Sequence, residues 1–199
     1  MKISPLPLSN RVAGLHRSAV ELWHLGLPIR PKDPLERLVL DQHWFNYELW
    51  HQEDEARRTD VPDSVIAQVK RNIDGLNQGR NDAIEKIDAW LLEYLKPVIR
   101  KSAELHSETA GSIIDRLSIL ALRIHHMKEQ ARRKRSPAGH AFSCRQKLKV
   151  LLEQEKDLLG CLNALLKRVM AGKSRFKLYR RFKMYNDPLL NPALYLKQR

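Results

Sequence analysis

The sequence predicts an all-α protein, an antiparallel bundle of about five long helices with a basic, aromatic C-terminal tail. Apolar residues recur at helical spacing along most of the chain, strand-like alternation is nearly absent, and there are only 8 glycines in 199 residues. With 43% apolar residues the chain can bury a core as one domain, 1–199, on which we expect the tail, 173–199, to dock.

The first two helices have recognisable ends. We expect the first to begin with Ser9 as its N-cap and to finish at Gly26, since serine accepts from free N–H groups and glycine favours a helix end. The segment PIRPKDP is a stiff connector. The second helix is predicted to begin at Pro34, because proline suits the first turn, where its missing N–H is not needed.

The third helix is predicted to run from Asp63, a suitable N-cap, to Pro97, which ends or kinks it. Its residues at spacings of three and four are typical of the buried face of a bundle helix. They are Ile66, Val69, Ile73, Leu76, Arg80, Ala83, Ile87, Trp90 and Tyr94. Arg80 is the charged residue among them, so part of the interior is predicted to be polar.

The fourth helix is predicted from about Ser112 to Arg133, and it is apolar on most of its circumference, which predicts a central position. The basic segment RRKRSPAGHAFS follows as an exposed loop, and the fifth helix closes at Gly172. The tail is expected to pack back on the bundle, because its Phe, Tyr and Leu side chains need burial.

Positive charge is concentrated in one half of the chain. Residues 1–94 carry 12 Lys and Arg against 15 Asp and Glu, whereas residues 95–199 carry 24 against 8. The net charge of +13 therefore comes entirely from the C-terminal half. Such asymmetry favours an anionic partner, either a small molecule, a partner protein or nucleic acid.

The opening MKISPLPLSN lacks the apolar region of a signal peptide, and no apolar run approaches the roughly 18 residues of a membrane span. A cytoplasmic location is therefore expected. Cys144 and Cys161 are too few for a disulfide framework and lack the spacing of a metal site.

The tetrapeptide ELWH occurs twice, ending at His24 and at His51. Glu-x-x-His on a helix is a ligand pair of dimetal carboxylate bundles, in which both ligands point to the interior. At about 100° per residue, Glu48 projects roughly 100° and His51 roughly 160° from the direction of Leu49, so the second pair points outward. The tryptophans explain the repeat as apolar anchors, and no metal is expected at these motifs.

A polar arc lies beside the apolar face of the third helix. It contains Lys70, Asp74, Asn77, Asn81, Glu85 and Asp88. On the second helix, Gln42 lies in the apolar seam, and Asn46 and Glu53 border it. Because a guanidinium inside a bundle is costly unless it is paired, we expect Arg80 to contact Glu53 or Asp54 of the second helix.

The fourth helix adds a second polar group. Asp115, Ser118 and His125 share one face, with Arg116 close by. Two interpretations stay open for this interior: a set of satisfied salt bridges and amides that fixes helix register, or a pocket for a ligand or for catalysis. No serine or cysteine nucleophile with a paired histidine is recognisable, and no glycine-rich phosphate loop is present.

Four stretches, NYELWHQEDEARR, KRNIDGLNQGRNDAIEKID, ETAGSIIDRLSILAL and YRRFKMYNDPLLNP, resemble in this order the signature segments of a bacterial family, domain of unknown function 4254. The positions that match the family pattern are Asn46, Trp50, His51, Glu53, Asp54, Arg57, Lys70, Asp74, Asn77, Gln78, Arg80, Asn81, Asp82, Glu85, Asp88, Gly111, Asp115, Arg116, Ser118, Phe182, Lys183, Tyr185, Asn186, Asp187 and Pro188. Ala110 departs from it, since the pattern has proline there. The resemblance implies no established activity, but it implies a link to cell-envelope polysaccharide assembly.

The first functional hypothesis is an anion-binding protein that uses the interior polar groove for a phosphorylated or sugar-nucleotide ligand. Amides and arginines bind phosphates and sugar hydroxyls well. The candidate ligand-binding residues are Asn46, Glu53, Asp54, Arg57, Asn77, Arg80, Asn81, Glu85, Asp88, Asp115, Arg116 and Ser118.

Two alternatives remain. The first is a Mg²⁺-dependent hydrolase similar to the all-α nucleotide pyrophosphatases, with Glu85 and Asp88 opposite Glu53 or Asp54; magnesium is implied only in this case. The second is a nucleic-acid-binding protein, since basic and aromatic residues interleave in the tail. Its candidate contacts are Arg132, Arg133, Lys134, Arg135, Lys177, Tyr179, Arg180, Lys183 and Tyr185.

Overall fold

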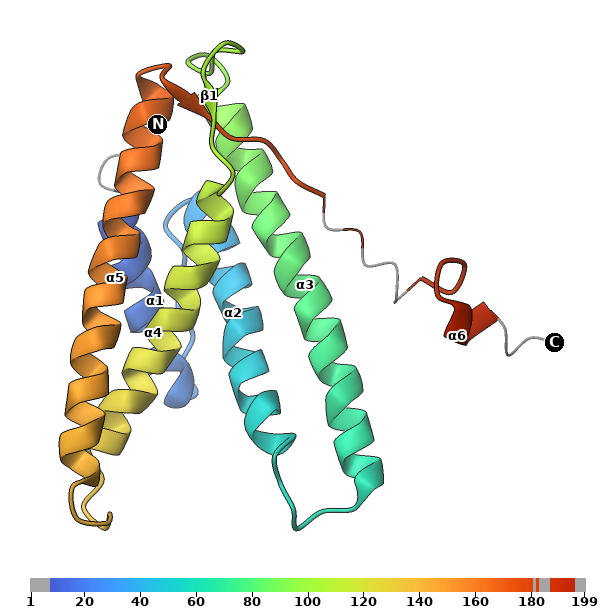
Figure 1. Cartoon of the computed structure of the whole chain (residues 1–199), viewed down its shortest axis with the longest axis vertical. Helices are drawn as coiled ribbons and strands as arrows, with labels where there is room; N and C mark the ends of the chain where they lie inside the picture. Colours follow the sequence, from blue (N-terminus) through green and yellow to red (C-terminus); the bar gives the residue numbers. More distant parts are fainter. Residues whose placement is uncertain (1–7, 181, 183–186, 196–199) are drawn as a thin grey trace.

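The structure, a computed structural model, describes residues 8–180, 182 and 187–195 and confirms the all-α bundle (Figure 1). The helices are α1 (Leu8–His24), α2 (Pro34–Glu55), α3 (Asp63–Leu95), α4 (Ala110–Arg132), α5 (His140–Met170) and the short α6 (Pro192–Tyr195). Two short strands, β1 (Glu104–Leu105) and β2 (Ser174–Arg175), pair in parallel at one end of the bundle. Among the described helices, none combines the length and apolar character needed to cross a bilayer.

The helix ends follow from local chemistry. Asp33 caps α2, because its Oδ1 accepts from the N–H of Glu36 at 2.9 Å, and Pro34 opens the helix as predicted. Thr109 caps α4 in the same way. The prediction of Asp63 as N-cap is wrong. Asp63 is the first residue of α3, where its charge suits the positive helix end, and Pro62 precedes it in extended conformation.

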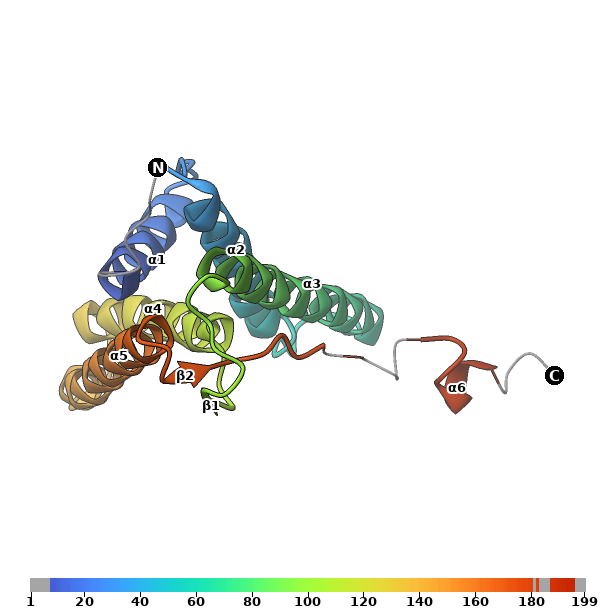
Figure 2. The same cartoon turned by 90° about the horizontal axis from the view of Figure 1, so that it is seen from above.

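The central position predicted for the fourth helix is confirmed. α4 contacts α1, α2, α3 and α5, and its apolar residues such as Ile114, Leu117 and Leu122 are fully buried. Figure 2 shows α4 between α5 on one side and the pair of α2 and α3 on the other. Polar residues on α4 are therefore placed where other helices surround them.

α2 and α3 form an antiparallel pair whose register positions the polar residues. A Cβ atom on Gly79 would lie 2.3 Å from the ring of Phe45, and Asn72 donates to Gln52 at 3.1 Å. Because residue 45 faces residue 79 and residue 52 faces residue 72, residue 80 lies at the level of residue 44 along the pair. Glu53 lies about two and a half turns further along α2, toward the loop that joins the helices.

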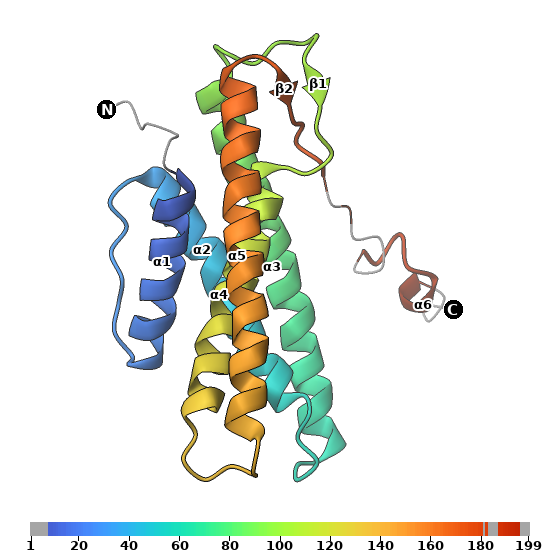
Figure 3. The same ribbon diagram turned by 60° about the vertical axis from the view of Figure 1, so that its left-hand side comes forward.

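Among the described residues, the first part of the C-terminal tail contacts the bundle. β2 pairs with β1, Phe176 is buried at 2% exposure, and Arg180 pairs with Glu85 of α3. The prediction that the later apolar side chains would be buried is wrong for Phe182 and Leu189, which are 84% and 85% exposed. Strand pairing, the buried ring and the ion pair attach the tail to the bundle as far as Arg180, and α6 stands apart from the bundle (Figure 3).

Candidate functional site

A polar cluster lies where α2, α3 and α4 meet, and we call it the polar centre. It consists of Gln42, His43, Asn46, Arg80, Asp115 and Ser118, and all but Arg80 are buried. Asp115 accepts at one carboxylate oxygen from Gln42 at 2.7 Å and from Asn46 at 2.9 Å. Asn46 also donates to Ser118 Oγ at 2.8 Å. The sequence therefore predicted an internal polar group correctly on α4, and the amides that satisfy it come from α2.

His43 and Ser118 form a pair that the sequence analysis did not recognise. His43 Nε2 lies 3.2 Å from the carbonyl of His16, so this nitrogen carries the proton, and His43 Nδ1 accepts from Ser118 Oγ at 2.6 Å. Burial lowers the pKa of His43 to about 3, which keeps the ring neutral. Because both side chains are 0% exposed, the pair has no access to a substrate and serves to hold α1, α2 and α4 in register.

Arg80 does not pair with Glu53 or Asp54, contrary to the sequence prediction. Its Nε lies 4.0 Å from Asp115 Oδ1 and, although buried, has no hydrogen-bond partner. The register of α2 and α3 explains the difference, since Glu53 lies about two and a half turns from the level of Arg80. Glu53 instead pairs on the surface with Arg57, four residues later, at 2.8 Å.

The remaining candidate ligand-binding residues divide into two groups. Asn77 of α3 is half-buried and lies three positions before Arg80, so the two are neighbours on the helix surface, and Asn81 is buried. Asp54 and Arg116 are exposed. The structure thus places Asn77 beside Arg80, and it leaves Glu53, Asp54 and Arg57 at the loop end of the α2–α3 pair.

Glu85 and Asp88 line a small separate pocket of about 220 Å³, together with Ser107, Glu108, Thr109 and Tyr179. Asp88 accepts the N–H of Gly111 at 2.7 Å, and Glu85 accepts from Arg180 at 2.9 Å. Both carboxylates are therefore engaged by protein donors. Glu53 is about 21 Å further along the hairpin than Glu85 by helix rise, so the carboxylate set of the hydrolase hypothesis is not brought together.

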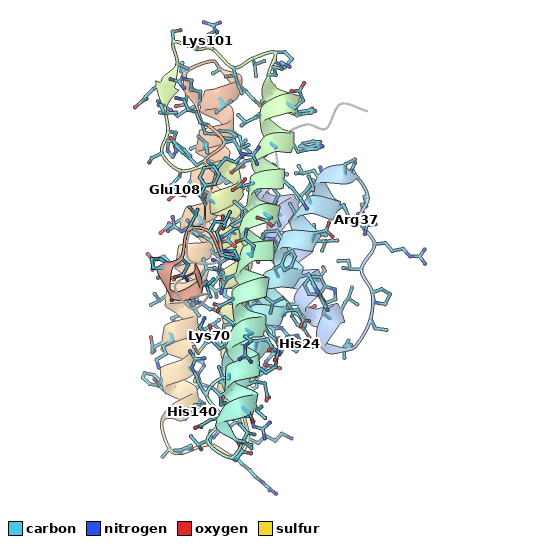
Figure 4. All side chains as sticks on the ribbon, turned by 90° about the vertical axis from the view of Figure 1, so that its right-hand side faces the viewer. His24, Arg37, Lys70, Lys101, Glu108 and His140 are labelled. Atoms are coloured by element: carbon cyan, nitrogen blue, oxygen red, sulfur yellow. The ribbon has the colours of Figure 1, made fainter. Side chains whose placement is uncertain are left out.

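Histidines that the sequence analysis treated one at a time come together at the other end of the bundle. The rings of His24, His51, His125 and His126 from α1, α2 and α4 are near neighbours, with centroid distances of 4.6 Å for His24–His125 and 5.3 Å for His24–His51. We call these four residues the histidine cluster. Figure 4 shows His24 well separated along the bundle from Glu108 of the small pocket. The repeated ELWH motif was the available signal, since both of its histidines belong to the cluster.

The basic segments do not form one continuous surface in the described part of the chain. Arg132 ends α4 and residues 133–135 follow it in the loop to α5, whereas Lys177 and Arg180 leave from β2 at the opposite end (Figure 1). Tyr179 is half-exposed beside the small pocket. Lys183 and Tyr185 lie outside the described residues.

The fold and the polar centre define a class of protein, an all-α bundle with an amide-rich, charged interior where its central helices meet. Residues 36–178 match the model of the family described as Protein of unknown function (DUF4254), and the chain belongs to that family. The match begins within α2, so His24 and the rest of α1 precede it. No match was found among curated proteins or among solved structures.

Proposed function

We propose that this protein binds a small anionic ligand, a phosphorylated compound or a nucleotide sugar, at the polar centre. The observation that carries the proposal is the state of Arg80. Its side chain is 25% exposed, its Nε is buried without a hydrogen-bond partner, and its nearest carboxylate oxygen is 4.0 Å away. A guanidinium in this situation has strong donors available for an anion.

The surroundings of Arg80 favour an oxygen-rich ligand. Asp115 Oδ1 already accepts from Gln42 and Asn46, so the carboxylate is shared by amides as well as by the guanidinium. Asn77 precedes Arg80 by three positions and is its neighbour on the helix surface. Amide and guanidinium donors together suit phosphate oxygens and sugar hydroxyls. A role in cell-envelope polysaccharide assembly and a cytoplasmic location are consistent with such a ligand and stay predictions.

The two alternatives have less support. The hydrolase needs carboxylates that converge, whereas Glu85 and Asp88 are engaged by Arg180 and by the N–H of Gly111. Nucleic-acid binding needs a continuous basic surface, and the loop after α4 is separated from the tail by α5, a helix of 31 residues and roughly 45 Å.

A thermal-shift and calorimetric titration tests the proposal, with UDP, UDP-glucose and inorganic pyrophosphate as probes in metal-free buffer. We expect at least one probe to raise the unfolding temperature of the wild type. Arg80→Gln should lose this shift, and the matched control Arg71→Gln, an exposed arginine of the same helix, should keep it. An equal shift in Arg80→Gln, or no shift in the wild type with any probe, would show the proposal to be wrong.

A further inference from the structure

The histidine cluster contains ring nitrogens that the fold itself does not use. One ring nitrogen from each of His24, His125 and His126 lies within 4.8 Å of the others. The Nε2 atoms of His51, His125 and His126 are buried and have no hydrogen-bond partner. Burying a polar atom without a partner is costly, so unpaired buried nitrogens in and beside this group of three rings indicate a ligand that the protein chain does not supply.

Hydrogen bonds fix which nitrogen of two rings is available. His24 Nδ1 lies 2.7 Å from the carbonyl of Val20, and a carbonyl only accepts, so Nδ1 carries the proton and Nε2 has the lone pair. His126 Nδ1 donates to Glu129 at 2.8 Å, which leaves its Nε2 with a lone pair as well. A histidine that donates from one ring nitrogen to a carboxylate or carbonyl is the usual arrangement of a metal ligand.

We propose that His24, His125 and His126 bind a divalent late transition metal of the Zn²⁺ type, with the ring of His51 as a neighbour of the site. Three or four neutral imidazoles suit Zn²⁺, Ni²⁺, Cu²⁺ or Co²⁺ and do not suit Mg²⁺ or Ca²⁺. Tetrahedral coordination at about 2.0–2.1 Å requires nitrogens about 3.3 Å apart, so the rings close by a small rotation of their side chains on binding.

The electrostatics of the cluster support a cation in a protein whose net charge is +13. Glu129 contacts both His125 and His126, at 3.6 Å and 2.8 Å. The negative charge of Glu21 is felt by His125, and those of Glu48 and Asp54 are felt by His51. Several acidic groups therefore lie near the histidines.

Aromatic side chains and a nearby pocket complete the surroundings. Trp50 stacks on His126 with centroids 4.6 Å apart, and Tyr47 meets the ring of His51 at the same distance, so both rings have limited freedom to turn away. His125 also lines a pocket of about 320 Å³ together with Arg17, Lys128 and Arg132.

The test uses the untagged chain of 199 residues, stripped with EDTA and titrated with Zn²⁺ by calorimetry at neutral pH. The wild type is expected to bind one ion per chain, and His24→Gln and His126→Gln should each bind at least about tenfold more weakly. The control is His106→Gln, because His106 is outside the cluster and bonds its ring to the carbonyl of Glu108. Its affinity should equal that of the wild type. Substitution by Co²⁺ should give the visible absorption of a tetrahedral site in the wild type and in the control.

A second variant keeps the test decisive if a histidine variant does not fold. Glu129→Gln preserves shape and leaves every proposed ligand in place, yet it should weaken binding by roughly 10–100-fold, because the carboxylate orients His126. Circular dichroism in EDTA checks that each variant folds. Zn²⁺ binding of the double variant His24→Gln, His126→Gln at wild-type affinity, or failure of the wild type to bind, would overturn the proposal. Neither result depends on the anion probes used for the polar centre.

Discussion

The polar centre and the histidine cluster are both polar regions inside one bundle, and they differ in how their atoms are paired. In the polar centre, Asp115 accepts from Gln42 and Asn46 of α2, and Ser118 accepts from Asn46 and donates to His43. In the histidine cluster, buried Nε2 atoms from α2 and α4 have no partner among the described residues. The hydrogen bonds of the polar centre hold helices together, whereas the unpaired nitrogens of the histidine cluster are available to a ligand. Within the polar centre, Arg80 has the same unsatisfied character, which is why the proposed anion site depends on it.

The largest effect is expected from Asp115→Ala. This change removes the acceptor of Gln42 and Asn46 and the countercharge of Arg80, so buried donors lose their partner. We expect the free energy of unfolding to fall by about 3–5 kcal/mol, measured by urea denaturation. Asp54→Ala, an exposed aspartate, is the control and should change it by less than about 0.5 kcal/mol.

A change in the histidine cluster is expected to have a smaller effect on stability. His126→Gln removes a stacked ring but leaves no buried donor without an acceptor, so its cost in EDTA should be nearer 1 kcal/mol. Equal losses for Asp115→Ala and His126→Gln would show that the two regions do not differ in the way described.

Acid is expected to destabilise the protein through His16 and His43. Both are fully buried and their rings lie 4.4 Å apart. Burial lowers the pKa of His16 well below its usual value, with the charges of His43 and Arg17 adding to the effect, and it lowers the pKa of His43 to about 3. The unfolded chain takes up protons below pH of about 6.5 while the folded chain does not. Stability is therefore fully present above that pH and falls as the pH drops toward 3.

The expected slope is on the order of 1 kcal/mol per pH unit for each histidine in that range. Urea denaturation at a series of pH values measures this slope. His43→Gln should reduce it by about 1 kcal/mol per pH unit, which is the contribution of one histidine. A slope unchanged by His43→Gln would mean that other groups cause the acid sensitivity. Burial raises the pKa of Asp33, but hydrogen bonds from Glu36 and Arg11 outweigh this effect and lower it. The contribution of Asp33 to stability is therefore lost at lower pH, and His43→Gln leaves it unchanged.

The sequence was sufficient for the fold because apolar spacing and helix breaks agree with one another along the chain, although Ser9 and Asp63, predicted as N-caps, are residues of α1 and α3. Pro34 begins α2, Gly172 follows α5 with a positive φ of 66°, and α4 is central because it is apolar nearly all round. The position of the tail was harder to predict. The apolar character of Phe182 and Leu189 favours burial, but it does not show which surface could cover them.

The site could be predicted only in part, because pairing across helices depends on axial register. Periodicity gives the direction of a side chain around its helix, and it correctly placed Asp115 and Ser118 inside. It does not say which residues of two helices lie at the same height. Because the axial positions of residues on neighbouring helices are not given by periodicity, the prediction that Arg80 pairs with Glu53 was wrong. For the same reason, the histidines from three helices were not recognised as a group.

The smallest effect is expected from Glu53→Gln, and it tests this register directly. Glu53 is about half-exposed and pairs with Arg57 one turn away on the same helix. Exposed pairs of this kind are worth roughly 0.3–0.5 kcal/mol, so unfolding should change by no more than that, and binding of any probe that depends on Arg80 should be unaltered. If Glu53→Gln instead destabilised the protein as much as Asp115→Ala, Glu53 would be a partner of Arg80 in solution. The antiparallel register set by Phe45 against Gly79 would then be incorrect.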